Sequence, residues 1–324
     1  MVSTWRQIQI QNFVSWEKLS LFLQLDKNEQ EILVKSSFPL NLPLRLAEKI
    51  QKQSLDDPIL KQFLPLTKEL LKESGFKEDP VGDASFKKES KLIQKYQGRA
   101  LLVVSSACAM HCRYCFRKNF SYEVSRKDFL PELAVIEKDA SLHEIILSGG
   151  DPLSLGNEEL KKLLESLDKI PHIKRIRFHT RFPIGIPERI DEPFLKILEE
   201  MTKQIIFVIH SNHPKELDST IFSSLKKIQK LGIPILNQSV LLKGINDSLD
   251  TLKELFETLS DHGILPYYLH QLDKVSGAGH FEVDESKGKS LMKELSKVLS
   301  GYSLPKYSKE EQGHFSKTII FHET

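Results

Sequence analysis

The chain has 324 residues, and its 46 Lys and Arg against 44 Asp and Glu leave a formal net charge of +2 at pH 7. Hydrophobic residues make up 40% and charged residues 28%, the composition of a globular protein with a sizeable core in one large or two medium domains. The balanced charge gives no reason to expect binding to nucleic acid or to a membrane surface. No apolar run approaches the ~20 residues that cross a bilayer, and the N-terminus has no apolar signal segment.

Residues 1–75 predict short helices without catalytic character, which we interpret as a packing or partner-docking cap. The helical stretches, separated by proline turns, are 17–25, 27–36, 43–53 and a short capped one within 56–65. Residues 74–89 contain Gly75, Pro80, Gly82 and many charges, which predicts a linker. The expected N-terminal unit therefore spans residues 1–89.

A different pattern begins at residue 90. Residues 100–105 form a continuous apolar run, as expected of a strand buried on both faces. Further strands alternate with helices from there on: strands at 144–148, 173–179, 204–210, 234–242 and 264–271, and helices at 157–170, 188–203, 215–231, 248–262 and 284–300. This alternation predicts an α/β fold with a parallel sheet, either open or curled into a barrel.

Polar or reactive residues follow nearly every predicted strand. These segments are 108–115, 149–151, 179–181, 210–213 and 271–273. In barrels the loops at the carboxyl ends of the strands build the active site, so we expect these segments to meet there.

The three cysteines of the chain, Cys108, Cys112 and Cys115, lie within eight residues as C-x3-C-x2-C. Three thiols cannot pair evenly into disulfides, and reduced thiols fit a cytoplasmic protein. Cubane clusters usually take four thiolates, so three would leave one iron open, and an open metal position is where a substrate binds. A structural zinc site with His111 or a distant histidine, or three unrelated buried thiols, are the alternatives.

With Tyr114 before the last cysteine, this motif resembles the signature of the radical S-adenosylmethionine (SAM) superfamily. The resemblance implies a [4Fe-4S] cluster on Cys108, Cys112 and Cys115, SAM on the open iron, and Tyr114 beside the adenine. The segment Ser148, Gly149, Gly150 and Asp151 resembles the one that holds the amino group of SAM. The implied fold is a partial (β/α)6 barrel over residues 90–300, with the cluster loop after its first strand.

From about residue 41 onward the chain also resembles the lysine 2,3-aminomutase family. The matching stretches are 95–99, 112–117, 148–151, 212–214, 232–242, 266–268, 280–281 and 300–305. These enzymes are isomerases that combine SAM with pyridoxal phosphate (PLP) and move the α-amino group of lysine to the β-carbon. The resemblance also implies an electron donor such as a flavodoxin or ferredoxin.

The family binds PLP through a lysine near the C-terminus, in a glycine-rich segment. Counting from the 300–305 stretch, the matching residue is Lys317, in a C-terminal segment 301–324, although only Gly313 remains of the glycine run. Lys306 and Lys309 are the competing candidates.

The resemblance places the donors for the PLP phosphate just before the first strand, at Lys95, Tyr96 and Arg99. Lys95 stands where the family has an arginine, so it would bind phosphate without the bidentate fork of a guanidinium. Three residues of a later strand are expected to contact SAM or PLP, or else to form a buried polar network: Asn237, Gln238 and Ser239.

For the substrate, the resemblance implies that Arg117 binds the carboxylate of L-lysine, a role that suits a bidentate arginine. Asp273 matches one of the acids that receive the side-chain ammonium. Glu310 stands where the family has a second aspartate, and its longer arm should alter the reach to that ammonium.

The chain stops seven residues after Lys317, whereas free-lysine enzymes of the family carry a long extension. This architecture and stretch 272–281 resemble the branch that makes (R)-β-lysine for elongation factor P, onto which a dedicated ligase attaches it. The alternatives are an enzyme that makes free β-lysine as a metabolite, a glutamate 2,3-aminomutase disfavoured by Asp273 and Glu310, and a non-catalytic cluster-binding redox protein.

Overall fold

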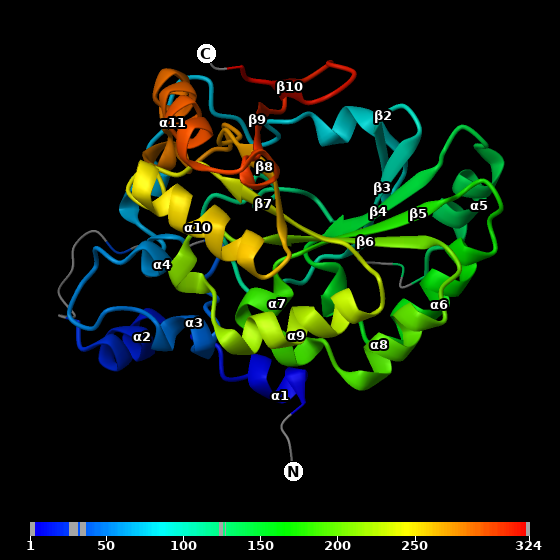
Figure 1. Cartoon of the computed structure of the whole chain (residues 1–324), viewed down its shortest axis with the longest axis horizontal. Helices are drawn as coiled ribbons and strands as arrows, with labels where there is room; N and C mark the ends of the chain where they lie inside the picture. The colour runs from blue at the N-terminus through cyan, green and yellow to red at the C-terminus, as the bar shows by residue number, and fades with distance from the viewer. Residues whose placement is uncertain (1–3, 26–31, 33–36, 123–125, 127, 322–324) are drawn as a thin grey trace.

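The computed structural model describes residues 4–25, 32, 37–122, 126 and 128–321 (Figure 1). Within these residues, ten strands form one sheet in which β1 to β10 lie side by side in sequence order. Seven neighbouring strands run parallel: β3 (Arg99–Ser105), β4 (Glu144–Gly149), β5 (Arg175–Thr180), β6 (Gln204–His210), β7 (Ile235–Val240), β8 (Leu265–His270) and β9 (Lys306–Lys309). Antiparallel strands flank them: β1 (Lys87–Glu89), β2 (Leu92–Tyr96) and β10 (Thr318–Ile319).

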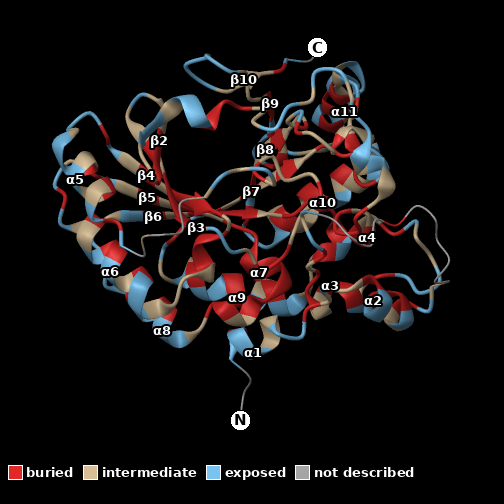
Figure 2. Ribbon diagram, turned by 180° about the vertical axis from the view of Figure 1, so that it is seen from behind, coloured by how far each residue is buried: buried red, intermediate tan, exposed pale blue. Residues whose placement is uncertain are grey.

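Helices cover one face of this sheet, as Figure 1 shows. They are α5 (Leu130–Lys138), α6 (Asn157–Asp168), α8 (Glu192–Glu199), α9 (Ser219–Lys230), α10 (Leu249–Asp261) and α11 (Glu285–Val298). Asp191, Asp218 and Ser248 cap α8, α9 and α10 by accepting a hydrogen bond from a backbone N–H of the first turn. Each helix buries an apolar stripe against the strands, and its outer side is exposed (Figure 2).

Strand β5 shows how the sheet separates its two faces. Ile176, Phe178 and Thr180 are buried, whereas Arg175, Arg177 and His179 alternate with them and are less buried. Because successive side chains of a strand point to opposite faces, the apolar set packs toward the helices and the polar set faces the other way. The sequence therefore gives the inner face of the sheet its polar character.

The remaining elements surround this core. The N-terminal region forms α1 (Trp5–Gln9), α2 (Trp16–Leu23), α3 (Leu44–Glu48) and α4 (Pro58–Lys61), at the bottom and one side of Figure 1. A short helix α7 (Phe182–Gly185) follows β5, and single 3-10 turns occur at η1 (Thr67–Leu70), η2 (Asp83–Phe86), η3 (Pro152–Ser154), η4 (Pro187–Arg189), η5 (Pro214–Glu216), η6 (Gly279–Phe281) and η7 (Gly301–Ser303).

The predicted α/β fold is confirmed: β3 to β8 are the six expected parallel strands, and the sheet does not close, since β1 and β10 form its two edges. The prediction of a linker at residues 74–89 is wrong in part, because residues 83–89 form η2 and β1 and Asp83 is buried. The strands β1, β2, β9 and β10 and the helices α1 and α5 were not predicted. The helix expected at 27–36 lies outside the described residues, apart from Ile32.

Two predicted helices begin later than expected. The stretch 188–203 contains only η4 up to Arg189 and then α8, whose first turn holds Pro193. Proline lacks the backbone N–H that a helix interior needs, so it stands near the start of a helix. Pro214 similarly starts η5, and α9 begins only at Ser219.

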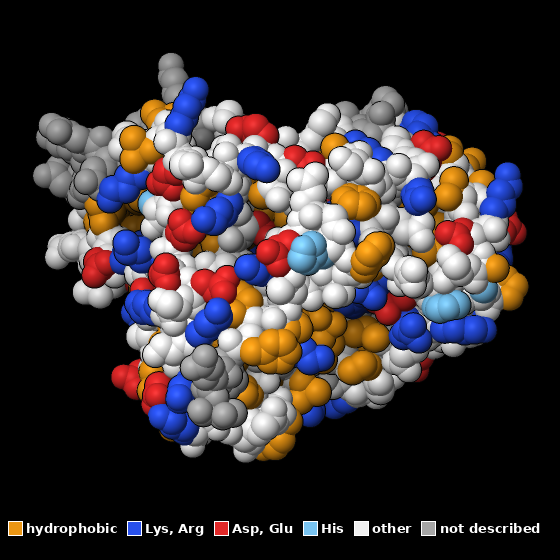
Figure 3. All heavy atoms as spheres, turned by 90° about the horizontal axis from the view of Figure 1, so that it is seen from above, with side chains coloured by type: hydrophobic (Ala, Val, Ile, Leu, Met, Phe, Trp, Pro, Cys, Tyr) orange, Lys and Arg blue, Asp and Glu red, His pale blue; other side chains and the backbone are white. Residues whose placement is uncertain are grey.

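None of the helices in the described part of the chain is both long and apolar enough to cross a membrane. The face seen from above mixes basic, acidic and apolar side chains (Figure 3), in keeping with the net charge of +2.

Candidate active site

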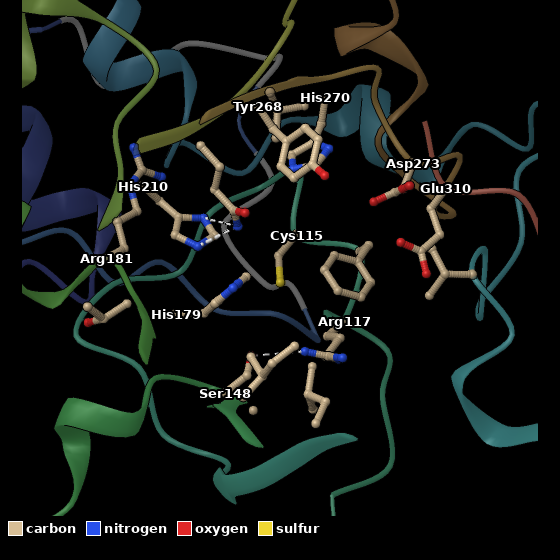
Figure 4. A pocket seen from close by; sticks show the side chains of 18 of the residues that line it. Cys115, Arg117, Ser148, His179, Arg181, His210, Tyr268, His270, Asp273 and Glu310 are labelled. Carbon is tan, nitrogen blue, oxygen red and sulfur yellow. Dashed lines mark hydrogen bonds between the residues drawn. The ribbon is translucent and has the colours of Figure 1, made fainter. Parts of the chain in front are cut away.

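The inner face of the sheet encloses a cavity of about 730 Å³. Side chains from every strand between β2 and β10 and from the cysteine loop line it. All residues predicted for the site contribute to this lining except Asn237 and Ser239. Figure 4 shows that Cys115, Arg117, His179, His210, Asp273 and Glu310 point into the same space from different elements.

The alternation of β7 decides which of its predicted residues reach the cavity. Gln238 lines the cavity, while Asn237 and Ser239 are buried on the opposite face. Asn237 Oδ1 accepts a hydrogen bond from Ser211 N at 2.9 Å, and Ser239 Oγ donates to Ser211 O at 2.7 Å. These two residues form the buried polar network that was the alternative interpretation.

The N-terminal region holds the cysteine loop in place. Asn12 Nδ2 donates to Ala109 O at 2.7 Å, and the backbone N–H of Arg113 donates to Gln62 O at 2.8 Å. The Arg113 guanidinium is fully buried and forms a 2.5 Å ion pair with Glu69. The segment that the sequence presents as a packing cap therefore forms the outer support of the three cysteines.

His111, the nearest ligand for the zinc alternative, is engaged elsewhere. Its Nδ1 lies 2.9 Å from Pro39 O, and its ring stacks on Phe38 with 4.7 Å between centroids. Among the described residues, no three His, Cys, Asp or Glu side chains are arranged as ligands of a single metal ion. A cubane does not require such an arrangement, because each thiolate there binds a different iron.

The three thiols fit an iron–sulfur cluster by their chemistry. All of them line the cavity from a single loop. Burial, the Asp151 carboxylate and the other two thiols raise the pKa of Cys108 well above its usual value, and burial and Cys112 raise that of Cys115 to about 11. A cationic iron cluster would reverse this effect by stabilising the thiolates, so the donor set suits such a group.

Gly149 and Gly150 approach the backbone of the cysteine loop rather than leaving open space. A Cβ on Gly150 would lie 2.3 Å from Ala107 O, and Gly149 adopts a φ of +124° that other residues rarely adopt. Gly150 N donates to Ser105 O at 2.6 Å, and Asp151 N donates to Ala107 O at 2.8 Å. The glycine pair therefore joins the end of β4 to the start of the cysteine loop.

The Asp151 carboxylate accepts four hydrogen bonds from the protein itself. Oδ1 accepts from Thr180 Oγ1 at 2.7 Å and from Leu153 N at 3.0 Å, and Oδ2 accepts from the backbone of Arg181 at 2.7 Å and of Phe182 at 3.0 Å. Burial raises the pKa of this carboxyl to about 6, although these hydrogen bonds act in the opposite direction. Asp151 thereby fixes the loop after β5, and with it the side chain of Arg181.

Arg181 is a site residue that sequence reasoning did not single out. Its Nη1 donates to Cys112 Sγ at 2.8 Å and to the Tyr114 hydroxyl, and its Nη2 donates to Gln62 at 2.7 Å and Glu216 at 2.8 Å. The only signal in the sequence was its position directly after a strand. A buried arginine here ties the cysteine loop to the neighbouring strand ends.

A chain of alternating charges runs along the wall of the cavity from Arg117, the arginine predicted to bind the substrate carboxylate. Arg117 Nη1 donates to Ser148 Oγ at 3.2 Å (dashed in Figure 4), and its Nε donates to Asp83 Oδ2 at 2.9 Å. Asp83 Oδ1 lies 2.7 Å from Lys95 Nζ, which also donates to Val81 O at 2.8 Å. Asp83 thus joins two cations that the sequence assigned to different ligands.

The chain of charges ends at the predicted PLP lysine. Glu310 Oε1 lies 3.2 Å from Lys95 Nζ, and Glu310 Oε2 accepts a 2.6 Å hydrogen bond from Lys317 Nζ. Burial alone would raise the pKa of Glu310, but the charges of Lys317 and Lys95 lower it to about 2. Of the competing lysines, Lys309 pairs with Glu285 at 3.1 Å and does not line the cavity, whereas Lys306 does.

Asp83 is the second residue that sequence reasoning missed, because it lies in the segment predicted as a linker. We expect Asp83→Asn to lower the free energy of unfolding by roughly 3 kcal/mol, because Lys95 and Arg117 would be left buried beside a neutral group. We also expect the KM for a substrate whose carboxylate binds Arg117 to rise, since Arg117 loses a partner that orients it. Urea unfolding and steady-state kinetics would measure both effects.

The stability that Asp83→Asn loses should depend on pH, which gives a further check. Burial alone would raise the pKa of Asp83, but Arg117 and Lys95 lower it below its ordinary value. A depressed pKa means that the carboxylate stabilises the fold above the unfolded pKa and ceases to do so as the pH falls through the folded pKa. The difference between wild type and variant should therefore shrink in acid, and Asp56→Asn, at an exposed ion pair with Lys61, should change little at any pH.

Asp273 differs from the other acids of the cavity because no hydrogen bond to its carboxylate is found within the described residues. Burial raises its pKa to about 6, with Lys317 opposing this effect and Glu310 adding to it. In Figure 4 its carboxylate faces that of Glu310. Two acids placed in this way would bind an ammonium group that lies between them.

Three neutral histidines line the cavity: His179, His210 and His270. The first two belong to segments expected at the site but were given no role there, and His270 was missed. Gln238 Nε2 lies 2.7 Å from His210 Nε2, and Ser308 Oγ lies 3.1 Å from His270 Nδ1. Burial and the charge of Arg181 lower the pKa of His210 to about 3, and burial also holds the pKa of the other two well below the usual value. The signal in the sequence was a histidine at or near the end of each of three strands.

Comparison with known proteins gives two kinds of match. A model of the Radical SAM superfamily matches residues 102–259. An L-lysine 2,3-aminomutase of Escherichia coli (strain K12) is 40% identical over 94% of this chain and 90% of that protein, and one of Haemophilus influenzae is 38% identical over 96% and 94%. An L-lysine 2,3-aminomutase of Clostridium subterminale is 30% identical over 98% of this chain and 77% of that protein.

Proposed function

Because the chain belongs to the lysine 2,3-aminomutase family of radical SAM enzymes, we propose that it converts L-α-lysine to (R)-β-lysine for the modification of elongation factor P. The observation that carries the substrate assignment is the placement of opposite charges around one cavity. Arg117 lies on the wall beside β4, and the acids Asp273 and Glu310 face each other at another side (Figure 4). This distribution matches an amino acid with a carboxylate at one end and an ammonium at the other.

The residues of the cavity suit the groups that this reaction needs. Cys108, Cys112 and Cys115 would hold the [4Fe-4S] cluster, Tyr114 and the segment 148–151 would lie against SAM, and Lys317 would carry PLP. When bound, the cluster and SAM supply the radical chemistry, and PLP carries the nitrogen that migrates. The protein brings these groups together, since the cysteines, the acids and Lys317 all line one cavity.

The chain binds lysine through three side chains in this proposal. The Arg117 guanidinium is held by Asp83 and Ser148 through Nε and Nη1, which leaves Nη2 without a hydrogen-bond partner in the described residues and directs the end of the group to a carboxylate. Asp273 and Glu310 would take the side-chain ammonium. They would repel the side-chain carboxylate of glutamate, which makes a glutamate 2,3-aminomutase the poorer candidate.

The destination of the product rests on sequence resemblance in the stretch 272–281 and in the segment around Lys317. The partners in this proposal are elongation factor P, its lysyl ligase, and an electron donor such as a flavodoxin or ferredoxin, all in the cytoplasm. A free-lysine enzyme that makes β-lysine as a metabolite is the second candidate.

One anaerobic assay tests the proposal. The protein is reconstituted with iron, sulfide and PLP, supplied with SAM, reductant and L-lysine, and the products are separated on a chiral column. (R)-β-lysine would support the elongation factor P branch, and the S form would indicate free-lysine metabolism. SAM cleavage without β-lysine would remove lysine as the substrate, and no SAM cleavage would favour a cluster-binding redox protein.

Asp273 gives this assay an expected pH dependence. Its raised pKa means that the carboxyl takes up a proton as the pH falls through about 6 and then no longer attracts an ammonium. We expect kcat/KM for lysine to fall below that pH by up to roughly tenfold for each unit. Asp273→Asn should remove this dependence. If the variant keeps it, Asp151, with a pKa also near 6, would be the responsible group.

A further inference from the structure

Lys95, one of the residues expected to bind the PLP phosphate, already has its charge balanced by the protein. Its Nζ lies 2.7 Å from Asp83 and 3.2 Å from Glu310, and its side chain is 12% exposed. An ammonium that two carboxylates share in a buried place has little attraction left for a third anion. The cations that hold the phosphate must therefore be sought elsewhere in the cavity.

Two arginines on the inner face of the sheet have donors to spare. Arg99 lies over the ring of Tyr96, 4.6 Å from its centroid, and no carboxylate pairs with it within the described residues. Arg177 donates through Nη2 to Glu144 at 2.5 Å, but its Nε is buried without a hydrogen-bond partner in the described part of the chain. Glu144 is also shared with Arg175, at 3.2 Å.

His179 adds a third donor on the same strand as Arg177. Residues two apart on β5 point to the same face, so both side chains line the cavity. His179 Nε2 is buried and has no partner among the described residues. Burial and the charge of Arg177 hold the pKa of this ring well below its usual value, so it is a neutral imidazole with one N–H to donate.

These donors lie near one another and near the predicted PLP lysine. Arg99 lies opposite Glu144 on the neighbouring strand, and Arg177 forms an ion pair with Glu144, so both guanidiniums line the cavity around one residue. The charges of both arginines also act on the Tyr268 phenol, another residue of the lining. The charge of Lys317 acts on His179, and both residues line the cavity. Figure 4 shows His179 and Tyr268 pointing into the same cavity.

We propose that Arg177 and Arg99, with the neutral His179, form the site of the PLP phosphate, and that Lys95 serves to position Asp83 and Glu310. Buried donors without partners are costly unless a ligand completes them, and two guanidiniums beside a phenol suit a dianionic phosphate. This inference rests on the proposed use of PLP. The inference changes which residues are expected to bind the PLP phosphate.

The test compares PLP with pyridoxal, which lacks the phosphate. Dissociation constants of both are measured by equilibrium dialysis for wild type, Arg177→Gln, Arg99→Gln, Lys95→Gln and Arg175→Gln. Because general damage to the fold affects both ligands, the ratio of the two constants isolates the phosphate. We expect Arg177→Gln and Arg99→Gln each to weaken PLP relative to pyridoxal by roughly tenfold or more.

Lys95→Gln should leave that ratio unchanged, and so should Arg175→Gln, which removes a half-exposed arginine of the same strand. An unchanged ratio in Arg177→Gln, or an equal loss in Lys95→Gln, would overturn the inference. If wild type binds pyridoxal as tightly as PLP, there is no phosphate site. If it binds neither, the proposed cofactor fails, and the inference falls with it.

Discussion

Replacing Lys317 with alanine should abolish the binding of PLP as a lysine-linked chromophore and lower aminomutase activity by on the order of a thousandfold or more. Lys317 belongs to the predicted C-terminal segment and lines the cavity, where its Nζ donates to Glu310. The change should leave the cysteine loop intact, because no contact joins the two within the described residues. The visible absorption of bound PLP and the iron content would measure both outcomes.

The controls use the competing lysines. Lys309→Ala removes a lysine that pairs with Glu285 and Glu311 away from the cavity and should keep PLP and activity. Lys317→Arg keeps a cation for Glu310 but cannot form the covalent link, so it should lose the chromophore with little loss of stability. Borohydride reduction followed by peptide mapping would identify the linked lysine directly, and label on Lys306 would show that Lys317 is the wrong choice.

Gly150→Ala should lower the iron and sulfide content of the reconstituted protein by roughly tenfold, because a methyl group in so close a place costs about 1–3 kcal/mol. Its Cβ would lie 2.3 Å from Ala107 O and 2.8 Å from Ser106 C, both backbone atoms of the cysteine loop. The two segments must separate to admit it, which weakens the Gly150 N to Ser105 O hydrogen bond of 2.6 Å and displaces Cys108.

A matched control is Gly301→Ala. No heavy atom lies within 4 Å of a Cβ built at Gly301, and its backbone is not left-handed, so cluster content should not change. The expectation for Gly150 is wrong if the variant takes up iron as wild type does. If circular dichroism shows that Gly150→Ala is unfolded, its iron content reports on the whole fold and not on the cysteine loop. Gly149→Ala, at a φ of +124°, then serves as the second variant.

Much of the fold could be predicted from the sequence because the patterns that indicate its strands and helices are local. An apolar run such as 204–210 predicts a buried strand wherever it occurs, and β6 spans the same residues. The cysteine spacing likewise lies within eight residues, so the sequence shows that the three thiols share one loop, whereas the contacts that hold this loop come from distant segments. Polar residues after nearly every strand predicted a site at the carboxyl ends, since parallel strands bring those ends together.

Short edge strands were not readable in this way. The strands β9 and β10 have four and two residues, too few for a periodic pattern, yet they place Glu310 and Lys317 against the cavity. The segment that ends in η2 looks like a linker by composition, and only packing shows that Asp83 is buried between two cations. Composition describes a segment, whereas burial depends on what covers it.

The sequence by itself determined the six central strands, the cysteine motif and the polar residues that follow most of these strands. The tertiary structure decided which face of β7 carries Gln238, which arginine reaches Cys112, and that the charge of Lys95 is balanced by Asp83 and Glu310. Lys95 and Glu310 are 215 positions apart in the sequence. Such contacts depend on the register and curvature of the whole sheet, and no local pattern in the chain encodes them.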